Sequence, residues 1–242
     1  MREAVASQLL RLNLEFYQTL AAPFAQTRAR LQPGVLRALT VLDSQASVLD
    51  LGCGSGTLAR ELARRGHRGP YLGLDSSPAL LEEAKRSGLP DHFRVQEADF
   101  SEAGWRAGVN GPFAAVFAFA VLHHIPGEER RLRLARELRA LLHTDGAVTL
   151  SAWDFLASDR LRSRIQPWGS VGLTREDVDP DDYLLDWRHG GPGLRYVHHF
   201  SEEELRRLAA DSGFEVREAW RSDGEAGRLG LYQRWAFPVD RS

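Results

Sequence analysis

One segment combines glycines with an acidic side chain in a way that suits the binding of a charged ligand. Asp50 lies in the apolar run 48–51, and Gly52, Gly54 and Gly56 follow it. Glycine permits positive φ angles and a close approach of a ligand to the backbone, and the helix expected at 58–65 presents free N–H groups at its positive end. A carboxylate at this position would repel a pyrophosphate but attract the ammonium group of an amino-acid-bearing cofactor.

Two further acids follow the next apolar runs. Asp75 ends the run 71–74, 19 residues beyond Gly56, where a carboxylate can accept hydrogen bonds from ribose hydroxyls. Asp99 follows a third run and could accept a hydrogen bond from an adenine amino group. The three acids fit S-adenosylmethionine better than a dinucleotide, for which we would expect Gly-x-Gly-x-x-Gly without Asp50.

The elements that must position these residues alternate along the chain. From about residue 47 onward, apolar runs of strand length alternate with helical periodicity, as in a parallel sheet with crossover helices. We predict an α/β, Rossmann-like fold: a seven-stranded, mostly parallel sheet with helices on both faces, closed by an antiparallel pair at 214–220 and 231–237. The other predicted strands are 48–51, 71–74, 92–96, 113–122 and 147–153, and the predicted helices include 58–65, 128–142 and 202–212.

Two segments stand outside this alternation, although we expect residues 1–242 to form a single domain. Residues 1–45 are predicted to be a helical N-terminal extension. Residues 155–200, with Gly, Pro, Trp and an acid-rich stretch at 176–186, are predicted to be an inserted lid or substrate segment. Ligands of open parallel sheets bind at the carboxyl edge of the strands, so both segments could cover the site.

Composition excludes several classes of protein. The chain has 242 residues, one cysteine and a formal charge of −2 from 31 basic and 33 acidic side chains, and 30 of the basic ones are arginine. The longest wholly apolar run, 113–122, is too short to span a bilayer as a helix, and no stretch of signal-peptide kind is present. We therefore expect a cytoplasmic protein without a membrane partner. No helical His-x-x-x-His spacing occurs, so we predict no metal site.

The glycine loop resembles that of the class I S-adenosylmethionine-dependent methyltransferases, whose motif is matched at Asp50, Gly52, Gly54 and Gly56. The resemblance implies S-adenosylmethionine as the methyl donor and S-adenosylhomocysteine as the product. The residues expected to bind the cofactor are Tyr17, Arg28, Asp50, Gly52, Gly54, Gly56, Asp75, Ser76, Asp99, Phe100 and Ala120.

Most of the chain resembles the tRNA wobble-uridine carboxymethyl methyltransferases. The matching elements are Phe16-Tyr17, Thr27-Arg28, the run 120–125, Trp153, Gln166-Pro167-Trp168, and Arg195-Tyr196 with His198 and Phe200. The chain departs from that pattern at Asp154, Val197 and the acidic stretch. The resemblance implies transfer to an oxygen of a modified tRNA base, with a small activator subunit as a further partner. The alternatives are a small-molecule O- or N-methyltransferase and a non-catalytic subunit that binds the cofactor and activates an enzyme.

The residue types restrict the chemistry further. Carbon-5 methylation of a pyrimidine needs a cysteine nucleophile, and the only cysteine, Cys53, lies in the glycine loop. A carboxylate acceptor is already ionised, so it needs positioning rather than a base, and Arg28, Arg195 or Tyr196 could provide that positioning. For a hydroxyl acceptor, the base would be His124 or His198, although the His123-His124 pair could equally pack structurally.

Overall fold

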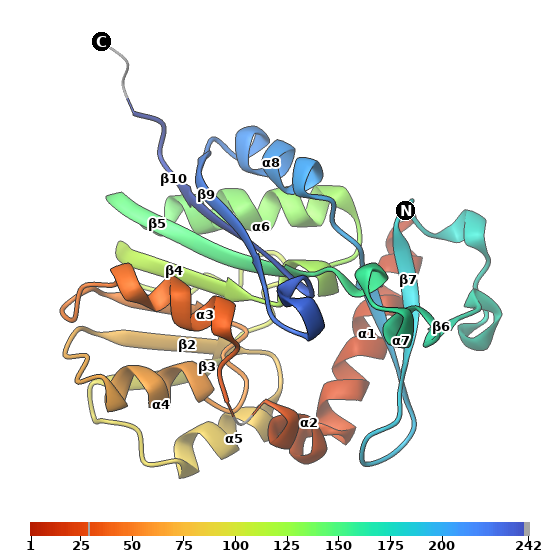
Figure 1. Ribbon diagram of the computed structural model, residues 1–242, viewed down its shortest axis with the longest axis horizontal. Helices are drawn as coiled ribbons and strands as arrows, with labels where there is room; N and C mark the ends of the chain where they lie inside the picture. Colours follow the sequence, from red (N-terminus) through yellow and green to blue (C-terminus); the bar gives the residue numbers. More distant parts are fainter. Residues whose placement is uncertain (29, 240–242) are drawn as a thin grey trace.

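The computed structural model describes residues 1–28 and 30–239, and its centre is a seven-stranded sheet (Figure 1). The strand order is β3-β2-β1-β4-β5-β10-β9. β1 to β5 run parallel, while β10 pairs antiparallel with both β5 and β9. This confirms the predicted fold class and the closing antiparallel pair. The strands are β1 (Val48–Leu51), β2 (Tyr71–Asp75), β3 (Phe93–Glu97), β4 (Phe113–Phe119), β5 (Leu142–Trp153), β9 (Glu215–Ser222) and β10 (Gly230–Ala236).

Helices cover both faces of this sheet because its strands are apolar on both sides. Leu49 and Leu51 of β1 pack toward α6 (Glu128–Ala140) and α8 (Glu202–Asp211). Val48 packs toward α3 (Pro33–Ala38) and α4 (Thr57–Arg64) on the other face. A further helix, α5 (Pro78–Arg86), begins at Ser77, whose hydroxyl accepts a hydrogen bond from the Leu80 N–H as an N-cap.

Two strand boundaries differ from the prediction by more than two residues. β4 was expected to reach residue 122 but ends at Phe119, because Ala120 adopts a positive φ of 57° and a 3₁₀ turn, Leu122–His124, follows. β5 begins at Leu142, earlier than the expected residue 147, so α6 ends at Ala140. Apolar character alone does not mark these points, since the turn after β4 is as apolar as the strand.

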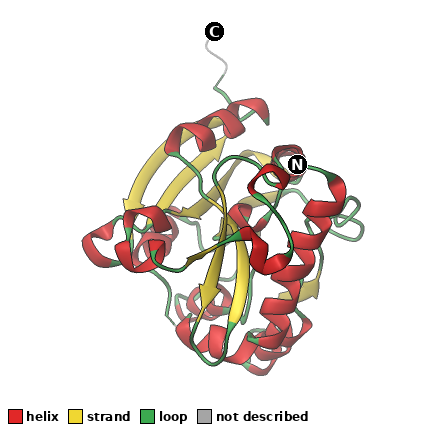
Figure 2. Cartoon of the chain, turned by 90° about the vertical axis from the view of Figure 1, so that its right-hand side faces the viewer, coloured by secondary structure: helices red, strands yellow, loops and turns green. Residues whose placement is uncertain are grey.

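The first two helices of the extension and the insert lie together beyond one end of the sheet, whereas α3 covers one of its faces (Figure 1). The extension forms α1 (Glu3–Thr19), α2 (Ala21–Thr27) and α3. The insert contains α7 (Asp159–Arg162) and a second, antiparallel sheet of β6 (Ile165–Gln166), β7 (Asp182–Trp187) and β8 (Gly193–His198). Figure 2 shows this small sheet beside the long helix α1, which packs against β8. The sequence predicted a lid here but not a sheet.

The longest helix of the described residues is α1, which has 17 residues. Across the described parts of the chain, no helix is both long and apolar enough to cross a bilayer.

Candidate active site

A cavity of about 920 Å³ opens beyond the carboxyl ends of β1, β2 and β4. The glycine loop and strand ends form one part of its lining, α1 and α2 another, and the insert a third. Figure 1 shows these covering elements on the right-hand side of the large sheet. The cavity therefore lies at the edge where the topology of the sheet predicts a ligand.

The glycine loop turns the chain from β1 into α4 and leaves room for a ligand. Gly52 and Gly54 have φ values of +74° and +54°, which favour glycine. A Cβ atom at Gly52 would come within 2.6 Å of Val121, whereas one at Gly54 would meet nothing within 4 Å. Because Gly54 lines the cavity, a ligand can approach its backbone closely.

Asp50 is the most deeply buried of the three predicted acids, with 3% of its surface exposed. One carboxylate oxygen accepts a hydrogen bond from the Tyr71 hydroxyl at 2.6 Å. Burial raises the pKa of Asp50 to about 7, although the bond from Tyr71 acts in the opposite direction. A nearby cation would therefore stabilise the ionised form of this carboxyl group.

Asp75 and Asp99 follow the neighbouring strands and also line the cavity. Asp75 accepts hydrogen bonds from the Gly54 N–H at 2.8 Å and from the Ser77 N–H at 2.9 Å, one on each oxygen. Burial raises its pKa. Asp99 accepts a bond from the Ser101 N–H at 3.0 Å. Each carboxylate keeps lone pairs for hydroxyl or amino groups of a ligand.

The other predicted cofactor residues divide into two groups. Gly56 does not line the cavity, although its neighbours Ser55 and Thr57 do, and its contact with the cofactor stays a prediction. A Cβ at Gly56 would lie 3.0 Å from Ala84, so this glycine serves the close packing of α4 on α5. The remaining members line the cavity: Tyr17, Arg28, Ser76, Phe100 and Ala120.

Tyr17 and His124 form a hydrogen-bonded pair at the cavity wall. The Nδ1 atom of His124 lies 3.1 Å from the Tyr196 carbonyl oxygen, which can only accept, so Nδ1 carries the proton. Nε2 then accepts a hydrogen bond from the Tyr17 hydroxyl at 2.8 Å. Burial and the charge of Arg195 lower the pKa of His124 to about 3. Both ring nitrogens are engaged, so this geometry does not present His124 as a free general base.

Arg195 brings a positive charge into the buried part of the cavity. Its side chain lines the cavity although the residue is only 3% exposed. The guanidinium carbon lies 4.8 Å from the ring centroid of Phe16, 5.1 Å from Trp187 and 5.4 Å from Trp153. Among the described residues the guanidinium has no ion pair, and its buried Nε has no hydrogen-bond partner. Such a cation is costly to bury unless an anion joins it.

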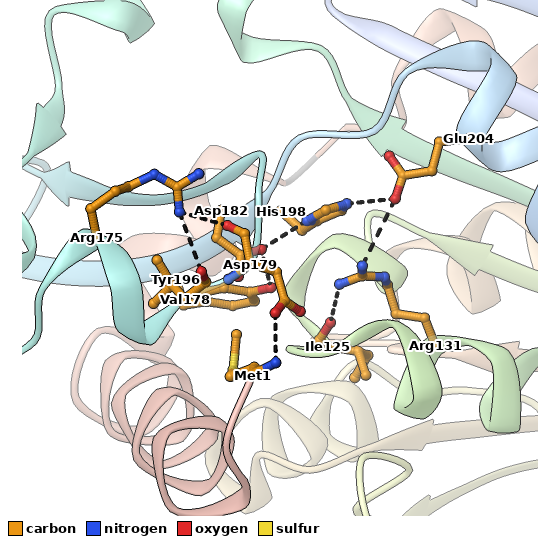
Figure 3. Close-up of polar contacts among 10 residues, drawn as sticks. All are labelled: Met1, Ile125, Arg131, Arg175, Val178, Asp179, Asp182, Tyr196, His198 and Glu204. Atoms are coloured by element: carbon orange, nitrogen blue, oxygen red, sulfur yellow. Dashed lines mark hydrogen bonds and ion pairs between the residues drawn. The ribbon is translucent and has the colours of Figure 1, made fainter.

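Tyr196 and His198 lie on the opposite face of β8 from Arg195, because side chains alternate along a strand. Neither lines the cavity, so the structure does not bring them together with Arg195, and their roles at the acceptor stay predictions. The Tyr196 hydroxyl donates to Asp182 at 2.7 Å. His198 bridges two carboxylates, with Nδ1 2.8 Å from Asp182 and Nε2 2.8 Å from Glu204 (Figure 3). This network joins the insert to α8.

His198 is charged more readily than an ordinary histidine. Burial lowers its pKa, but the hydrogen bonds to Asp182 and Glu204 outweigh that effect and raise the pKa above its usual value. Arg131 of α6 lies 3.8 Å from the same Glu204 carboxylate. The network therefore connects the insert to α6 and α8, and none of its four side chains lines the cavity.

Most of the acidic residues that line the cavity and all of its arginines come from different parts of the chain. Acids at the carboxyl edge of the large sheet supply most of the negative charge: Asp50, Asp75, Asp99 and Glu102. Two further acids line the cavity from elsewhere, Asp186 of the insert and Asp223 after β9. Six arginines come only from the extension and the insert: Arg11, Arg28, Arg30, Arg160, Arg164 and Arg195. Within the described chain none of these six forms an ion pair. The sheet edge thus suits cationic and hydroxyl groups, and the covering segments suit an anion.

The acid-rich stretch of the insert does not oppose this arrangement. Asp177 pairs with Arg2, and Asp186 pairs with Arg188 at 2.7 Å. Asp182 is fully buried in the contact with His198. Asp177 and Asp182 are therefore used within the protein. Asp186 also lines the cavity, where the insert adds three arginines as well, and its Oδ1 atom has no hydrogen-bond partner in the described structure.

Two residues of the site were missed by the sequence reasoning. Asn13 of α1 is 5% exposed and bonds to the backbone of Tyr196. It lies in the apolar stripe of α1, together with Leu9 and Phe16, and a polar residue in such a stripe was the available signal. His123 lines the cavity, and its buried Nδ1 has no hydrogen-bond partner in the described structure. Nothing in the sequence distinguished it from its neighbour.

These features fit S-adenosylmethionine. Gly54 provides open space at the backbone, Asp50 is buried without an ion pair in the described part of the chain, and Asp75 and Asp99 keep free lone pairs. The fold and the site together define the class as an S-adenosylmethionine-dependent methyltransferase.

Comparison with known proteins agrees with this class. Residues 24–219 match the family described as "Methyltransferase domain", and the chain belongs to that family. It is 30% identical over 205 residues to a protein of Encephalitozoon cuniculi that is named as a methyltransferase, with 83% of this chain and 86% of that protein covered.

More specific names come from shorter matches. The chain is 37% identical over 105 residues to a trans-aconitate 2-methyltransferase of Deinococcus radiodurans, which covers 43% of this chain and 38% of that protein. It is 28% identical over 142 residues to a tRNA (carboxymethyluridine(34)-5-O)-methyltransferase of Xenopus tropicalis, which covers 57% of this chain and 20% of that protein. In both cases the chain spans well under half of the relative.

A solved structure has the same fold. The 1,6-didemethyltoxoflavin-N1-methyltransferase of Burkholderia thailandensis, solved with S-adenosylhomocysteine, superposes with a TM-score of 0.65 at 19% identity, and the match covers 99% of this chain and 91% of that one.

Proposed function

We propose that the enzyme transfers the methyl group of S-adenosylmethionine to a carboxylate oxygen and forms a methyl ester. Arg195 carries this proposal. A guanidinium matches a carboxylate bidentately, and this one is buried between aromatic rings without an acidic partner in the described structure. An acceptor carboxylate would supply the missing negative charge.

The remaining residues support an acceptor that needs no deprotonation. When bound, the cofactor supplies an electrophilic methyl group on a sulfonium. A carboxylate is ionised at neutral pH, so no base is required, which agrees with the engaged nitrogens of His124. Phe16, Trp153 and Trp187 surround the guanidinium of Arg195, so an anion held there would lose part of its hydration and become a better nucleophile.

Our specific proposal for the acceptor is a tRNA wobble uridine that bears a carboxymethyl group. Arg28, Arg30 and Arg160 are exposed and line the cavity without ion pairs in the described chain, so they are available for phosphate groups. The motifs around Tyr17 and Arg195 support the same family. The Xenopus relative is named for that reaction.

A small carboxylic acid is the second candidate. The depth of Arg195 favours it, because a compact acid can enter a site that is only 3% exposed more easily than a folded RNA. The Deinococcus relative is named for trans-aconitate, which also carries carboxylates.

Labelled methyl transfer tests the proposal. The enzyme is incubated with methyl-labelled S-adenosylmethionine and either hypomodified tRNA or a pool of small carboxylic acids. Because carboxyl esters hydrolyse in mild alkali whereas N-methyl groups and ethers do not, the label should be released as methanol. Alkali-stable label would refute the carboxylate acceptor, and the pool that becomes labelled identifies its carrier. No transfer to either pool would refute both candidates.

A further inference from the structure

We propose that Asn13 is a positioning residue for the acceptor site. Its carboxamide fixes the segment of β8 that carries Arg195 and also sets the orientation of His124. The inference rests on the proposed role of Arg195, but it concerns a residue of α1 that does not belong to the motifs discussed above.

Asn13 completes the hydrogen bonding of an edge strand. β8 pairs with β7 on one side only, and its other side faces α1. The Oδ1 atom of Asn13 accepts a hydrogen bond from the Tyr196 N–H at 2.8 Å, and its Nδ2 donates to the Tyr196 carbonyl at 3.1 Å. The side chain thus acts on Tyr196 as one residue of a neighbouring strand would, at a place where backbone groups are buried and need partners.

The same contact reaches His124. The Tyr196 carbonyl that Asn13 holds also accepts the Nδ1–H of His124 at 3.1 Å. Asn13 Nδ2 lies 3.4 Å from the His124 carbonyl oxygen as well. The tautomer that lets Tyr17 donate to Nε2 at 2.8 Å therefore depends on a carbonyl that Asn13 keeps in place.

Arg195 precedes Tyr196 directly, so it follows any shift of that backbone. Its guanidinium depends on the register of β8, because three rings enclose it and no protein carboxylate of the described chain holds it. A displacement of about 1 Å at a reacting or binding group can cost on the order of 100-fold in rate. Loss of Asn13 should therefore impair the acceptor rather than the cofactor, whose acids lie at the ends of the large sheet.

The test compares Asn13→Leu with Gln8→Leu. Gln8 is a matched control, because it lies on the same helix and its Nε2 donates to the Val171 carbonyl of the insert at 2.7 Å, yet it does not line the cavity. The acceptor is whichever probe wild type methylates, 5-carboxymethyluridine tRNA or trans-aconitate. Asn13→Leu should raise the acceptor KM about tenfold or more and leave the Kd for S-adenosylmethionine within about twofold. Gln8→Leu should change neither.

The pH dependence of the acceptor KM in Asn13→Asp distinguishes a positioning residue from a purely structural one. The introduced carboxylate faces the Tyr196 carbonyl, but once protonated it can donate to that oxygen as the amide does. Its acceptor KM should therefore improve more steeply as the pH falls than the acceptor KM of wild type or of Gln8→Leu. A pH profile of Asn13→Asp that parallels wild type would overturn the proposal.

Hydrogen exchange supplies a readout that needs no acceptor. In Asn13→Leu, the amides of 193–198 should exchange faster than in wild type, and in Gln8→Leu they should not. Equal exchange, or an acceptor KM no higher than that of Gln8→Leu, would refute the role of Asn13. If Arg195→Met leaves the acceptor KM unchanged, the proposed function itself fails, and these two failures are distinguishable.

Discussion

Replacement of Arg195 by methionine should separate acceptor binding from stability. A bidentate carboxylate would make two charge-assisted hydrogen bonds to the guanidinium, each worth about 1.5–3 kcal/mol. Loss of both bonds removes at least about 3 kcal/mol of binding free energy. Because each factor of ten in affinity corresponds to about 1.4 kcal/mol, the acceptor KM should rise more than about 100-fold. Because no cofactor acid contacts Arg195, the Kd for S-adenosylmethionine should stay near the wild-type value.

The stability of the same variant should change little or increase. Burial of an unpaired cation destabilises the fold by several kcal/mol. The cation–π contacts with the three surrounding rings stabilise it by about 0.5–2 kcal/mol each. Methionine fills much of the same volume without the charge. The free energy of unfolding should thus fall by no more than about 1 kcal/mol, since the two terms nearly cancel.

Steady-state kinetics, calorimetry with the cofactor and urea unfolding measure these three quantities. Arg188→Met is the matched control, because Arg188 is exposed, pairs with Asp186 on the same hairpin and does not line the large cavity. A large loss of stability in Arg195→Met with an unchanged acceptor KM would show that Arg195 is a packing residue and would refute our reasoning.

Three further predictions concern the cofactor and the lid. Asp75→Ala should weaken S-adenosylmethionine binding about tenfold or more, because a charged acceptor of hydrogen bonds is lost, and unchanged calorimetric affinity would contradict this. Cofactor affinity should rise between about pH 6 and pH 8 as Asp50, with its pKa of about 7, ionises, and Asp50→Asn should abolish that dependence. His198 has a raised pKa, so its bonds to Asp182 and Glu204 stabilise the fold fully below about pH 6.5 and weaken as the pH rises through the folded value. The Tm of wild type should therefore fall at alkaline pH, and that of His198→Gln should fall less.

The large sheet could be predicted because its signals are local. Each strand is a short apolar run. A helix-capping pair such as Ser77-Pro78, or a turn such as the loop at Gly52, marks the point where a strand ends and a helix follows. The end of β4 was missed because Ala120, without glycine or proline, takes a positive φ. The small sheet was missed because β7 contains two acids, Asp182, which is buried, and Asp186, which is half-buried, in a stretch that looks solvated.

The cofactor side of the site was more predictable than the acceptor side, for a physical reason. Asp50 and Asp75 lie at the ends of strands, so sequence position fixes their place in space. The direction of a side chain in the insert depends on which face of an edge strand it occupies. A motif such as Arg195 to His198 does not indicate which of its side chains point toward the cavity. The sequence therefore grouped Arg195 with Tyr196 and His198, which the strand separates.

The placement of Arg195 and His198 on opposite faces of one strand can couple acceptor binding to the attachment of the insert to α8, although the two sites share no atoms. Arg195 and His198 lie on opposite faces of β8, one at the acceptor cavity and one in the contact with α8. Suppose that the acceptor binds only when the insert is attached to α8 through His198. Acceptor binding must then stabilise this attachment by the same factor by which the attachment raises the acceptor affinity. Acceptor affinity would then decline with alkalinity through a histidine that the acceptor never touches, while cofactor affinity, governed by Asp50, moves in the opposite direction. An enzyme built in this way would work best within a limited interval of pH, bounded by two groups on separate parts of the fold.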